Sequence, residues 1–185
     1  MKVLALSGSL RAASINSALL RAAARLAPPD VSVLVFGGLG ELPLFNPDQE
    51  ANRPGNVAAF QHLVAESDAL LIASPEYAHG VTGTIKNALD WLVGFELFAS
   101  KPVAVLNASP RARHADTALR ETLKTMAAVV IEPASIPLPL LGANLDEDGM
   151  VATPSVVTAI RDSLTALYEA VALQRVTETS AFPFR

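Results

Sequence analysis

Short apolar runs alternate with longer amphipathic stretches along most of this chain. The apolar runs are rich in aliphatic and β-branched residues and lie at residues 2–6, 31–36, 69–73 and 102–106. Helical periodicity fills the intervals, at residues 16–26, 57–66, 84–93 and 116–127. A fifth strand is expected near residues 129–131, and a last helix over residues 155–174, after the start signal Thr153-Pro154. The alternation predicts an α/β fold in which helices cover both faces of a five-stranded parallel sheet.

The length of 185 residues favours a single domain spanning residues 1–185. Residues 37–55 form a long polar, proline-bearing connection, which we interpret as an ordered surface loop. Residues 175–185 lack a helical pattern and carry Phe182 and Phe184. Two interpretations of this tail stay open, a frayed end and a segment docked on a partner subunit.

Composition narrows the class of ligand. The net charge of −4 offers no basic surface for nucleic acid, and no apolar run of about 18 residues is present to span a bilayer. The first apolar run is too short for a signal-peptide core, so we expect a cytoplasmic protein with a small-molecule partner. The chain has no cysteine, and its three histidines match no common zinc spacing, so no metal site is predicted.

A candidate anion site follows the first apolar run, where residues 8–16 read Gly-Ser-Leu-Arg-Ala-Ala-Ser-Ile-Asn. Backbone N–H groups at the start of the following helix attract anions. Ser9 and Ser14 add hydroxyl donors and Asn16 an amide donor, and the planar guanidinium of Arg11 suits phosphate oxygens. The sequence matches neither Gly-x-Gly-x-x-Gly nor a Walker loop, which disfavours a Rossmann dehydrogenase and a P-loop kinase. The alternative interpretation makes Ser14 an ordinary helix cap that needs no ligand.

A candidate planar-ring site follows the third apolar run. Pro75, Glu76 and Tyr77 come there, and two glycines precede the next helix. The glycines let the backbone approach a flat ligand, and Tyr77 supplies an aromatic wall. His79 in the same loop is interpreted either as an acid or as a solvated side chain.

Together, the two segments resemble the NADPH-dependent FMN reductase family, which includes quinone, azo and chromate reductases. The resemblance rests on Gly-Ser-Leu-Arg-x-x-Ser-x-Asn at residues 8–16 and on Pro-Glu-Tyr followed by Lys-Asn-Ala-Leu-Asp-Trp within residues 75–91. It implies a flavodoxin-like three-layer sandwich with strand order 2-1-3-4-5, and FMN at the carboxyl ends of the strands, where the order switches. It also implies a homodimer or homotetramer.

The resemblance further implies a set of cofactor-binding residues. The FMN phosphate is expected against the first segment, at Ser9, Leu10, Arg11, Ser14, Ile15 and Asn16. The isoalloxazine ring is expected against a second group, chiefly through its backbone, at Pro75, Glu76, Tyr77 and Ala78. Ser109, after the fourth strand, is a further candidate for a flavin contact.

Two departures from the family pattern affect the ring site. Many relatives have asparagine where Ala78 stands, so a side-chain contact from that position is lost. Many also have a Gly-Gly-bearing loop after the fourth strand, whereas residues 107–114 read Asn-Ala-Ser-Pro-Arg-Ala-Arg-His, which changes how closely this loop approaches the ring. Arg111 and Arg113 in this loop either bind substrate, at the 2′-phosphate of NADPH, or are solvated.

The resemblance implies an enzyme in which NADPH or NADH passes hydride to N5 of FMN, and a quinone, azo compound, free flavin or metal oxyanion then takes the electrons. No catalytic side chain is expected, because the flavin carries the chemistry. The alternative is a flavodoxin-type electron carrier without NAD(P)H oxidation, which usually has a strongly acidic docking face. A scaffold that no longer binds flavin is a third hypothesis, raised by the altered loop at residues 107–114. The preferred reductant, the acceptor and the number of subunits stay open.

Overall fold

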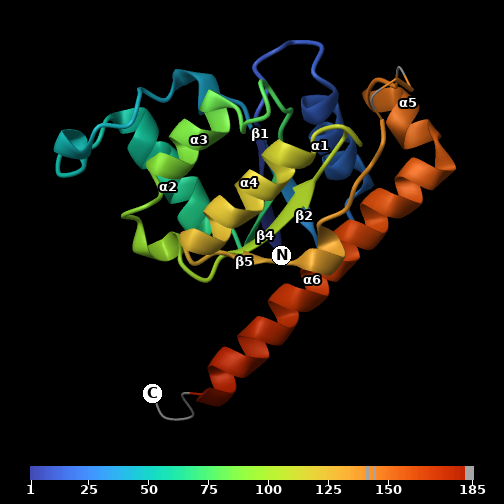
Figure 1. The fold of residues 1–185 in the computed structure, drawn as a ribbon. Coiled ribbons are helices and arrows are strands. Elements are labelled where there is room, and N and C mark those ends of the chain that lie inside the picture. Colours follow the sequence, from blue (N-terminus) through green and yellow to red (C-terminus); the bar gives the residue numbers. More distant parts are fainter. Residues whose placement is uncertain (141, 144, 182–185) are drawn as a thin grey trace.

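The computed structural model describes residues 1–140, 142–143 and 145–181 and places a five-stranded parallel sheet at the centre of the molecule (Figure 1). Its strand order is β2-β1-β3-β4-β5, which confirms the predicted flavodoxin-like arrangement. The strands are β1 (Lys2–Ser7), β2 (Ser32–Phe36), β3 (Ala69–Ala73), β4 (Pro102–Leu106) and β5 (Val129–Val130).

Strand β1 lies between β2 and β3, so the order of the sheet reverses there. Ala5 aligns with Val35 of β2 on one side and with Leu71 of β3 on the other. Strands β3 and β4 are buried along their whole length, as expected for parallel strands covered on both faces. The reversal opens a crevice at the carboxyl ends of β1 and β3, where α/β folds of this kind place their ligands.

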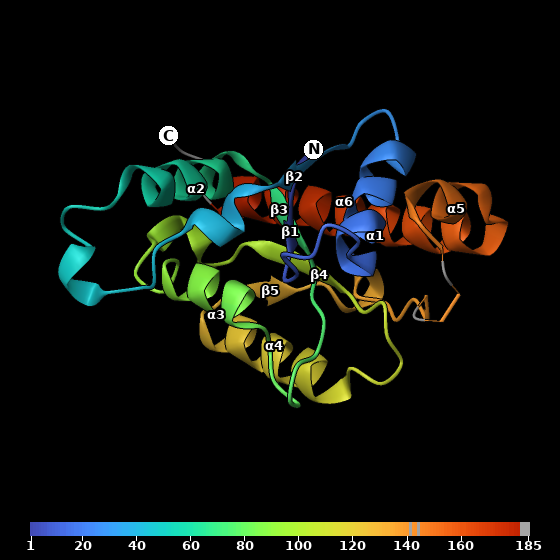
Figure 2. The same ribbon diagram turned by 90° about the horizontal axis from the view of Figure 1, so that it is seen from above.

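Helices cover both faces of the sheet, and the alternation of side chains along β1 shows why. Val3 and Ala5 pack into one core with α1 (Ile15–Leu26) and α6 (Pro154–Ala181). Leu4 and Leu6 pack into a second core with α2 (Gly55–Glu66), α3 (Gly83–Asp90) and α4 (Arg113–Thr125). Figure 2 shows α1 and α6 on the opposite side of the sheet from α3 and α4. A short helix, α5 (Glu147–Ala152), precedes α6 in the chain.

Helix α6 corrects the expectation for the end of the chain. It continues to Ala181, although the pattern predicted a helix ending near residue 174 and an irregular segment after it. Polar contacts anchor it where the apolar pattern stops, because Gln174 Nε2 donates to Ser100 O at 3.2 Å and Arg175 forms an ion pair with Asp68 at 2.5 Å. The end of α6 projects from the body of the protein (Figure 1). Phe182 and Phe184 lie outside the described residues.

The long connection after β2 is ordered, as the sequence predicted. It contains two short 3-10 helices, at Gly38–Glu41 and Pro47–Gln49. Asn87 Nδ2 and Trp91 Nε1 both donate to the carbonyl of Pro43, at 3.0 and 2.8 Å, and tie the loop to α3 and its end. No helix within the described ranges is long and apolar enough to cross a membrane.

Candidate functional site

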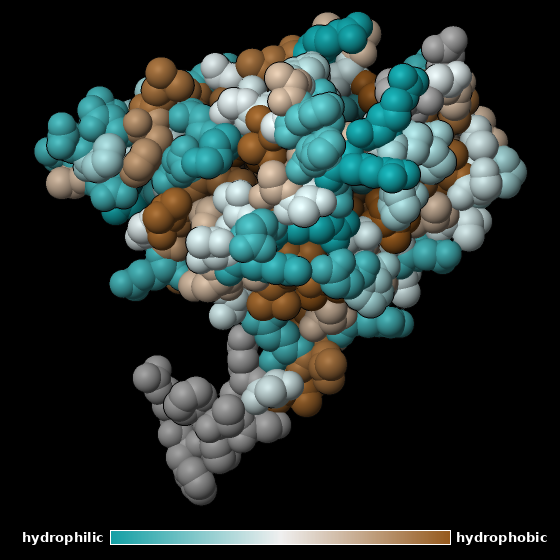
Figure 3. Space-filling view, viewed as in Figure 1, coloured by the Kyte–Doolittle hydropathy of each residue, from teal (hydrophilic) through white to brown (hydrophobic). Residues whose placement is uncertain are grey.

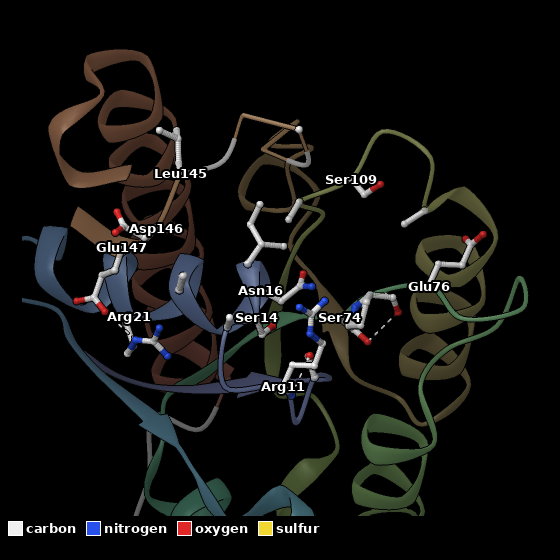
Figure 4. Close-up of a pocket in the computed structure, with 18 of the residues that line it drawn as sticks. Arg11, Ser14, Asn16, Arg21, Ser74, Glu76, Ser109, Leu145, Asp146 and Glu147 are labelled. Carbon is white, nitrogen blue, oxygen red and sulfur yellow. Dashed lines mark hydrogen bonds and ion pairs between the residues drawn. The ribbon is translucent and has the colours of Figure 1, made fainter. Parts of the chain in front are cut away.

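A cavity of about 1020 Å³ lies at the carboxyl ends of β1, β3 and β4 (Figure 4). Three loops that follow these strands border it, and the segment that leads into α5 closes one side. The volume is at the upper limit of the usual range for small-molecule sites. The cavity therefore brings together segments that are far apart in the sequence.

The loop after β1 and the start of α1 form one end of the cavity, which we call the phosphate end (Ser9, Arg11, Ser14 and Asn16). Ser14 caps α1, since its Oγ accepts from Ser17 N at 3.3 Å, and Ser9 Oγ accepts from Arg11 N at 3.4 Å. Each serine uses a lone pair in these bonds and keeps its hydroxyl proton free to donate. Figure 4 shows the Arg11 guanidinium directed between Asn16 and Ser74.

Asn16 provides the observation that tests whether these residues fit a ligand. Its side chain is 5% exposed, and its Oδ1 has no hydrogen-bond partner among the described residues. A buried carbonyl oxygen without a partner costs free energy unless a ligand or water satisfies it. Because the amide carries donors beside this acceptor, Asn16 fits a ligand that combines a phosphate with hydroxyl groups.

Gly8 brings the first and second loops into contact. Its N–H donates to Ala73 O at 2.9 Å, across the junction of β1 and β3. A Cβ at Gly8 would lie 2.1 Å from Ser74 Oγ and 2.9 Å from Ile85 Cγ1. Only glycine therefore allows the two loops to pack this closely at the bottom of the cavity.

The loops after β3 and β4 form the other end of the cavity, which we call the ring end (Pro75, Glu76, Tyr77, Ser109 and Arg111). Tyr77 and Gly80 exchange two backbone hydrogen bonds around a two-residue turn. The turn residues Ala78 and His79 both have positive φ, of 50° and 60°, as a type I′ turn requires. Glycine and asparagine are the usual residues in such turns, so the side chains here are held in a strained backbone conformation.

Charged side chains of both signs line the cavity wall, and they differ in whether the protein supplies them with partners. Its carboxylates have partners within the protein: Glu76 accepts from Ala115 N, Asp146 caps α5, and Glu147 and Asp148 accept from arginines of α1. The guanidinium groups of Arg11 and Arg111, in contrast, have no partner within the described part of the chain. These two guanidinium groups are therefore available to anionic groups of a ligand.

Helix α5 is held against α1 by ion pairs at the side of the cavity. Glu147 accepts from Arg21 Nε at 2.7 Å and from Arg25 at 3.2 Å. The hydrogen bond from Arg21 lowers the pKa of Glu147, partial burial opposes this shift, and Arg25 adds to it. Hydrogen bonds to Asp148 and Glu147 raise the pKa of Arg25. Of these residues, Arg21, Glu147 and Asp148 border the cavity.

The structure brings most of the predicted site residues together. Nine of the eleven residues predicted to bind the cofactor line the cavity, namely Ser9, Arg11, Ser14, Ile15, Asn16, Pro75, Glu76, Tyr77 and Ser109. Leu10 and Ala78 are outside its wall. Of the two predicted substrate-binding arginines, Arg111 lines the cavity and Arg113, at the first position of α4, does not.

Sequence reasoning missed the wall contributed by Arg21 and by Leu145, Asp146, Glu147 and Asp148. A usable signal was Asp146, an aspartate that caps α5 through Gly149 N at 2.8 Å. Helix α5 has only six residues, too few for a periodic pattern. The described residues contain no cluster of three histidine, aspartate or glutamate side chains placed to hold a metal ion.

Comparison with known proteins adds evidence independent of the cavity. A family model described as NADPH-dependent FMN reductase matches residues 1–143. An NAD(P)H-dependent FMN reductase of Pseudomonas aeruginosa is 42% identical over 112 residues, which cover 59% of this chain and 60% of that protein. A 2-hydroxy-1,4-benzoquinone reductase of a Burkholderia species is 39% identical over 112 residues, covering 59% and 61%. The chain thus spans about three fifths of the length of these relatives.

Among solved structures, the flavoenzyme NAD(P)H:(acceptor) oxidoreductase FerB from Paracoccus denitrificans superposes on this chain with a TM-score of 0.81. The two are 27% identical, and the match covers 92% of this chain and 97% of that one. An NADH:FMN oxidoreductase superposes with a TM-score of 0.63 at 22% identity, over 89% of each chain, and supports the fold alone.

Proposed function

The chain belongs to the NADPH-dependent FMN reductase family, and from that premise we propose that it is an FMN-dependent oxidoreductase. In this proposal it passes electrons from NADPH or NADH to small-molecule acceptors, quinones first among them. The observation that carries the proposal is the phosphate end, where buried hydroxyl donors, the unpartnered Asn16 Oδ1 and the free Arg11 guanidinium line the same part of the cavity. Relatives named as quinone and FMN reductases support this choice.

The residues present fit FMN at both ends of the cavity. Ser9, Ser14 and Arg11 would hold the phosphate together with the first N–H groups of α1. Asn16 Oδ1 would accept from a ribityl hydroxyl. Tyr77 is 57% exposed and offers an aromatic face to the ring. FMN, when bound, supplies the atom that accepts hydride, so the side chains need only bind and orient the reactants.

Arg111 is our candidate for recognising the reductant. It borders the ring end, is exposed and lacks an internal partner within the described residues, so its guanidinium is available to the 2′-phosphate that distinguishes NADPH from NADH. Arg113 is a weaker candidate, because it lies outside the cavity wall. We therefore propose a preference for NADPH that depends on Arg111.

The proposal is tested by titrating the purified protein with FMN and mixing the complex anaerobically with NADPH or NADH. We expect a bound-flavin spectrum that bleaches with NADPH and returns when a quinone is added. In Arg111→Ala, the NADPH concentration for half-maximal bleaching rate should rise about tenfold while that for NADH stays unchanged, as loss of one charged hydrogen bond predicts. Arg161→Ala removes the same charge from an exposed position on α6 and should change neither.

Two other results would contradict the proposal. Bound FMN that stays oxidised with both nucleotides would indicate an electron carrier. Failure to bind FMN would remove the site assignment itself.

We further propose a homo-oligomer in which the projecting end of α6 takes part. Leu173 and Val176 on this end are 68% and 64% exposed, and Figure 3 shows hydrophobic residues where the helix leaves the body. Exposed apolar side chains on a projecting helix suit a contact with a second copy. A sedimentation measurement of mass tests this, with Leu173→Glu expected to shift the protein toward monomer. The cytoplasmic location stays a prediction.

A further inference from the structure

The two loops that border the ring end are far apart in the sequence. One follows β3 and the other follows β4, and their backbones are about 35 residues apart in the sequence. Asn107 stiffens the second loop from within, since its Oδ1 accepts from Ser109 N and its Nδ2 donates to Ala112 O, both at 3.0 Å. Both bonds lie within the loop after β4, so they do not fix its position relative to the loop after β3.

A hydrogen bond at the start of α4 connects the two loops. The residue before α4, Ala112, has no side chain able to cap the helix, and no hydrogen bond from its side chain is present. Glu76 takes over this role from the first loop, because its Oε2 accepts from Ala115 N at 2.8 Å, across 39 residues of sequence. A carboxylate at this position also interacts favourably with the helix dipole. Figure 4 shows Glu76 beside the first turn of α4.

A second contact joins the same two segments. The rings of His79 and His114 stack with centroids 4.4 Å apart and planes inclined by 21°. His79 belongs to the strained turn after Tyr77, and His114 is the second residue of α4. The strained turn persists only if its surroundings hold it, and the stack supplies one such restraint. We call these two contacts, Glu76–Ala115 and His79–His114, the α4 clasp.

We infer that Glu76 is a positioning residue, whose carboxylate caps α4 and thereby fixes the separation of the two loops at the ring end. The inference rests on the proposed function, because it supposes that a flat ligand binds between the two loops. In this inference the α4 clasp keeps the loops at the separation that such a ligand needs. Glu76 lines the cavity, yet its side chain turns to the helix. Its effect on the ligand therefore passes through the loop after β4, which carries Ser109 and Arg111.

The test compares Glu76→Ala with Glu76→Gln, which keeps an oxygen able to accept from Ala115 N. FMN and riboflavin are titrated separately by flavin fluorescence. Riboflavin lacks the phosphate, so its affinity reports the ring end without the phosphate contacts of Ser9, Arg11 and Ser14. We expect Glu76→Ala to lower the affinity for both flavins by the same factor, about tenfold, as for a lost charged hydrogen bond. Glu76→Gln should stay within about threefold of the wild type, and the FMN-to-riboflavin affinity ratio should not change in either variant.

Hydrogen exchange without flavin supplies the second readout. In Glu76→Ala, the Ala115 amide should exchange at least tenfold faster, with little change in the amides of α1. His114→Ala, which breaks the stack from the helix side, should weaken both flavins by a smaller equal factor. His62→Ala, an exposed histidine on α2, is the matched control and should change nothing.

Three results would overturn the inference. The first is an unchanged affinity for both flavins in Glu76→Ala, and the second is an unchanged exchange rate of the Ala115 amide in that variant. The third is a loss of flavin affinity in Glu76→Gln as large as in Glu76→Ala, which would show that the negative charge is needed and the hydrogen bond to Ala115 N is not. If the wild type binds neither flavin, the proposed function fails, while the exchange measurement still decides whether Glu76 caps α4.

Discussion

The two ends of the cavity are built in different ways. The phosphate end comes from one continuous segment, residues 8–16, which leads from the end of β1 through a turn into the capped helix α1. It offers side-chain and backbone donors, most of them buried. The ring end comes from two loops after different strands, offers mostly backbone and an exposed tyrosine, and includes a strained turn. One end of the cavity is thus built by a local motif, whereas the other depends on contacts between distant loops.

The largest expected effect removes charge from the phosphate end. Arg11→Ala should weaken the binding of FMN by about 1.5 to 3 kcal/mol, the range for a hydrogen bond to a charged group, and leave the binding of riboflavin unchanged. Parallel fluorescence titrations of the two flavins measure this difference. Arg161→Ala, which removes an exposed arginine from α6, serves as the control. An equal loss for both flavins would show that the two ends do not act separately.

Gly8 is the point at which the two ends touch. Gly8→Ala should lower the free energy of unfolding by about 1 to 3 kcal/mol, the cost of overpacking, because the added Cβ would lie 2.1 Å from Ser74 Oγ. Urea unfolding measures the change. Gly37→Ala adds the same methyl group where no atom lies within 4 Å, and should shift the midpoint little. Equal stability of the two variants would refute the close contact.

Ser14 separates helix capping from ligand binding within the phosphate end. Ser14→Ala should cost about 1 kcal/mol of stability, because Ser17 N loses its cap, whereas Ser14→Gly should cost only a few tenths. Both variants lack the hydroxyl, so both should lose the same FMN affinity, and neither should lose riboflavin affinity. Thermal unfolding measures the change in stability, and flavin titration measures the change in affinity. FMN affinity that followed stability instead would make Ser14 a cap only.

The smallest expected effect concerns the ion pairs beside the phosphate end. Arg21 lowers the pKa of Glu147 in the folded protein, so the carboxylate adds stability above its ordinary pKa of about 4.3 and loses it as the pH falls through the lowered value. The wild type should therefore exceed Glu147→Gln in stability by less than about 1 kcal/mol at pH 7, since such pairs are partly exposed. Urea unfolding from pH 7 to pH 3 measures the difference. A difference that does not shrink below about pH 4 would argue against the ion pair.

Much of the fold could be predicted from the pattern of apolar residues. The runs at residues 2–6, 69–73 and 102–106 are strands almost to the residue, because strands buried on both faces must be continuously apolar. Helix α4 begins three residues before its predicted start, and α6 continues past residue 174, because caps and ion pairs from other segments set those ends. Helix α5 was not predicted, because six residues give too little periodicity.

The sequence by itself determined the phosphate end, since Gly8, Ser9, Arg11, Ser14 and Asn16 are placed by a strand, a turn and a helix cap within one short segment. Such geometry depends on local hydrogen bonds that each residue type favours. Only the tertiary structure decided that Glu76 caps a helix 39 residues away, that His79 stacks on His114, and that Arg21 and Glu147 close the side of the cavity. These contacts join segments brought together by the packing of the sheet, and no local propensity of the chain specifies them.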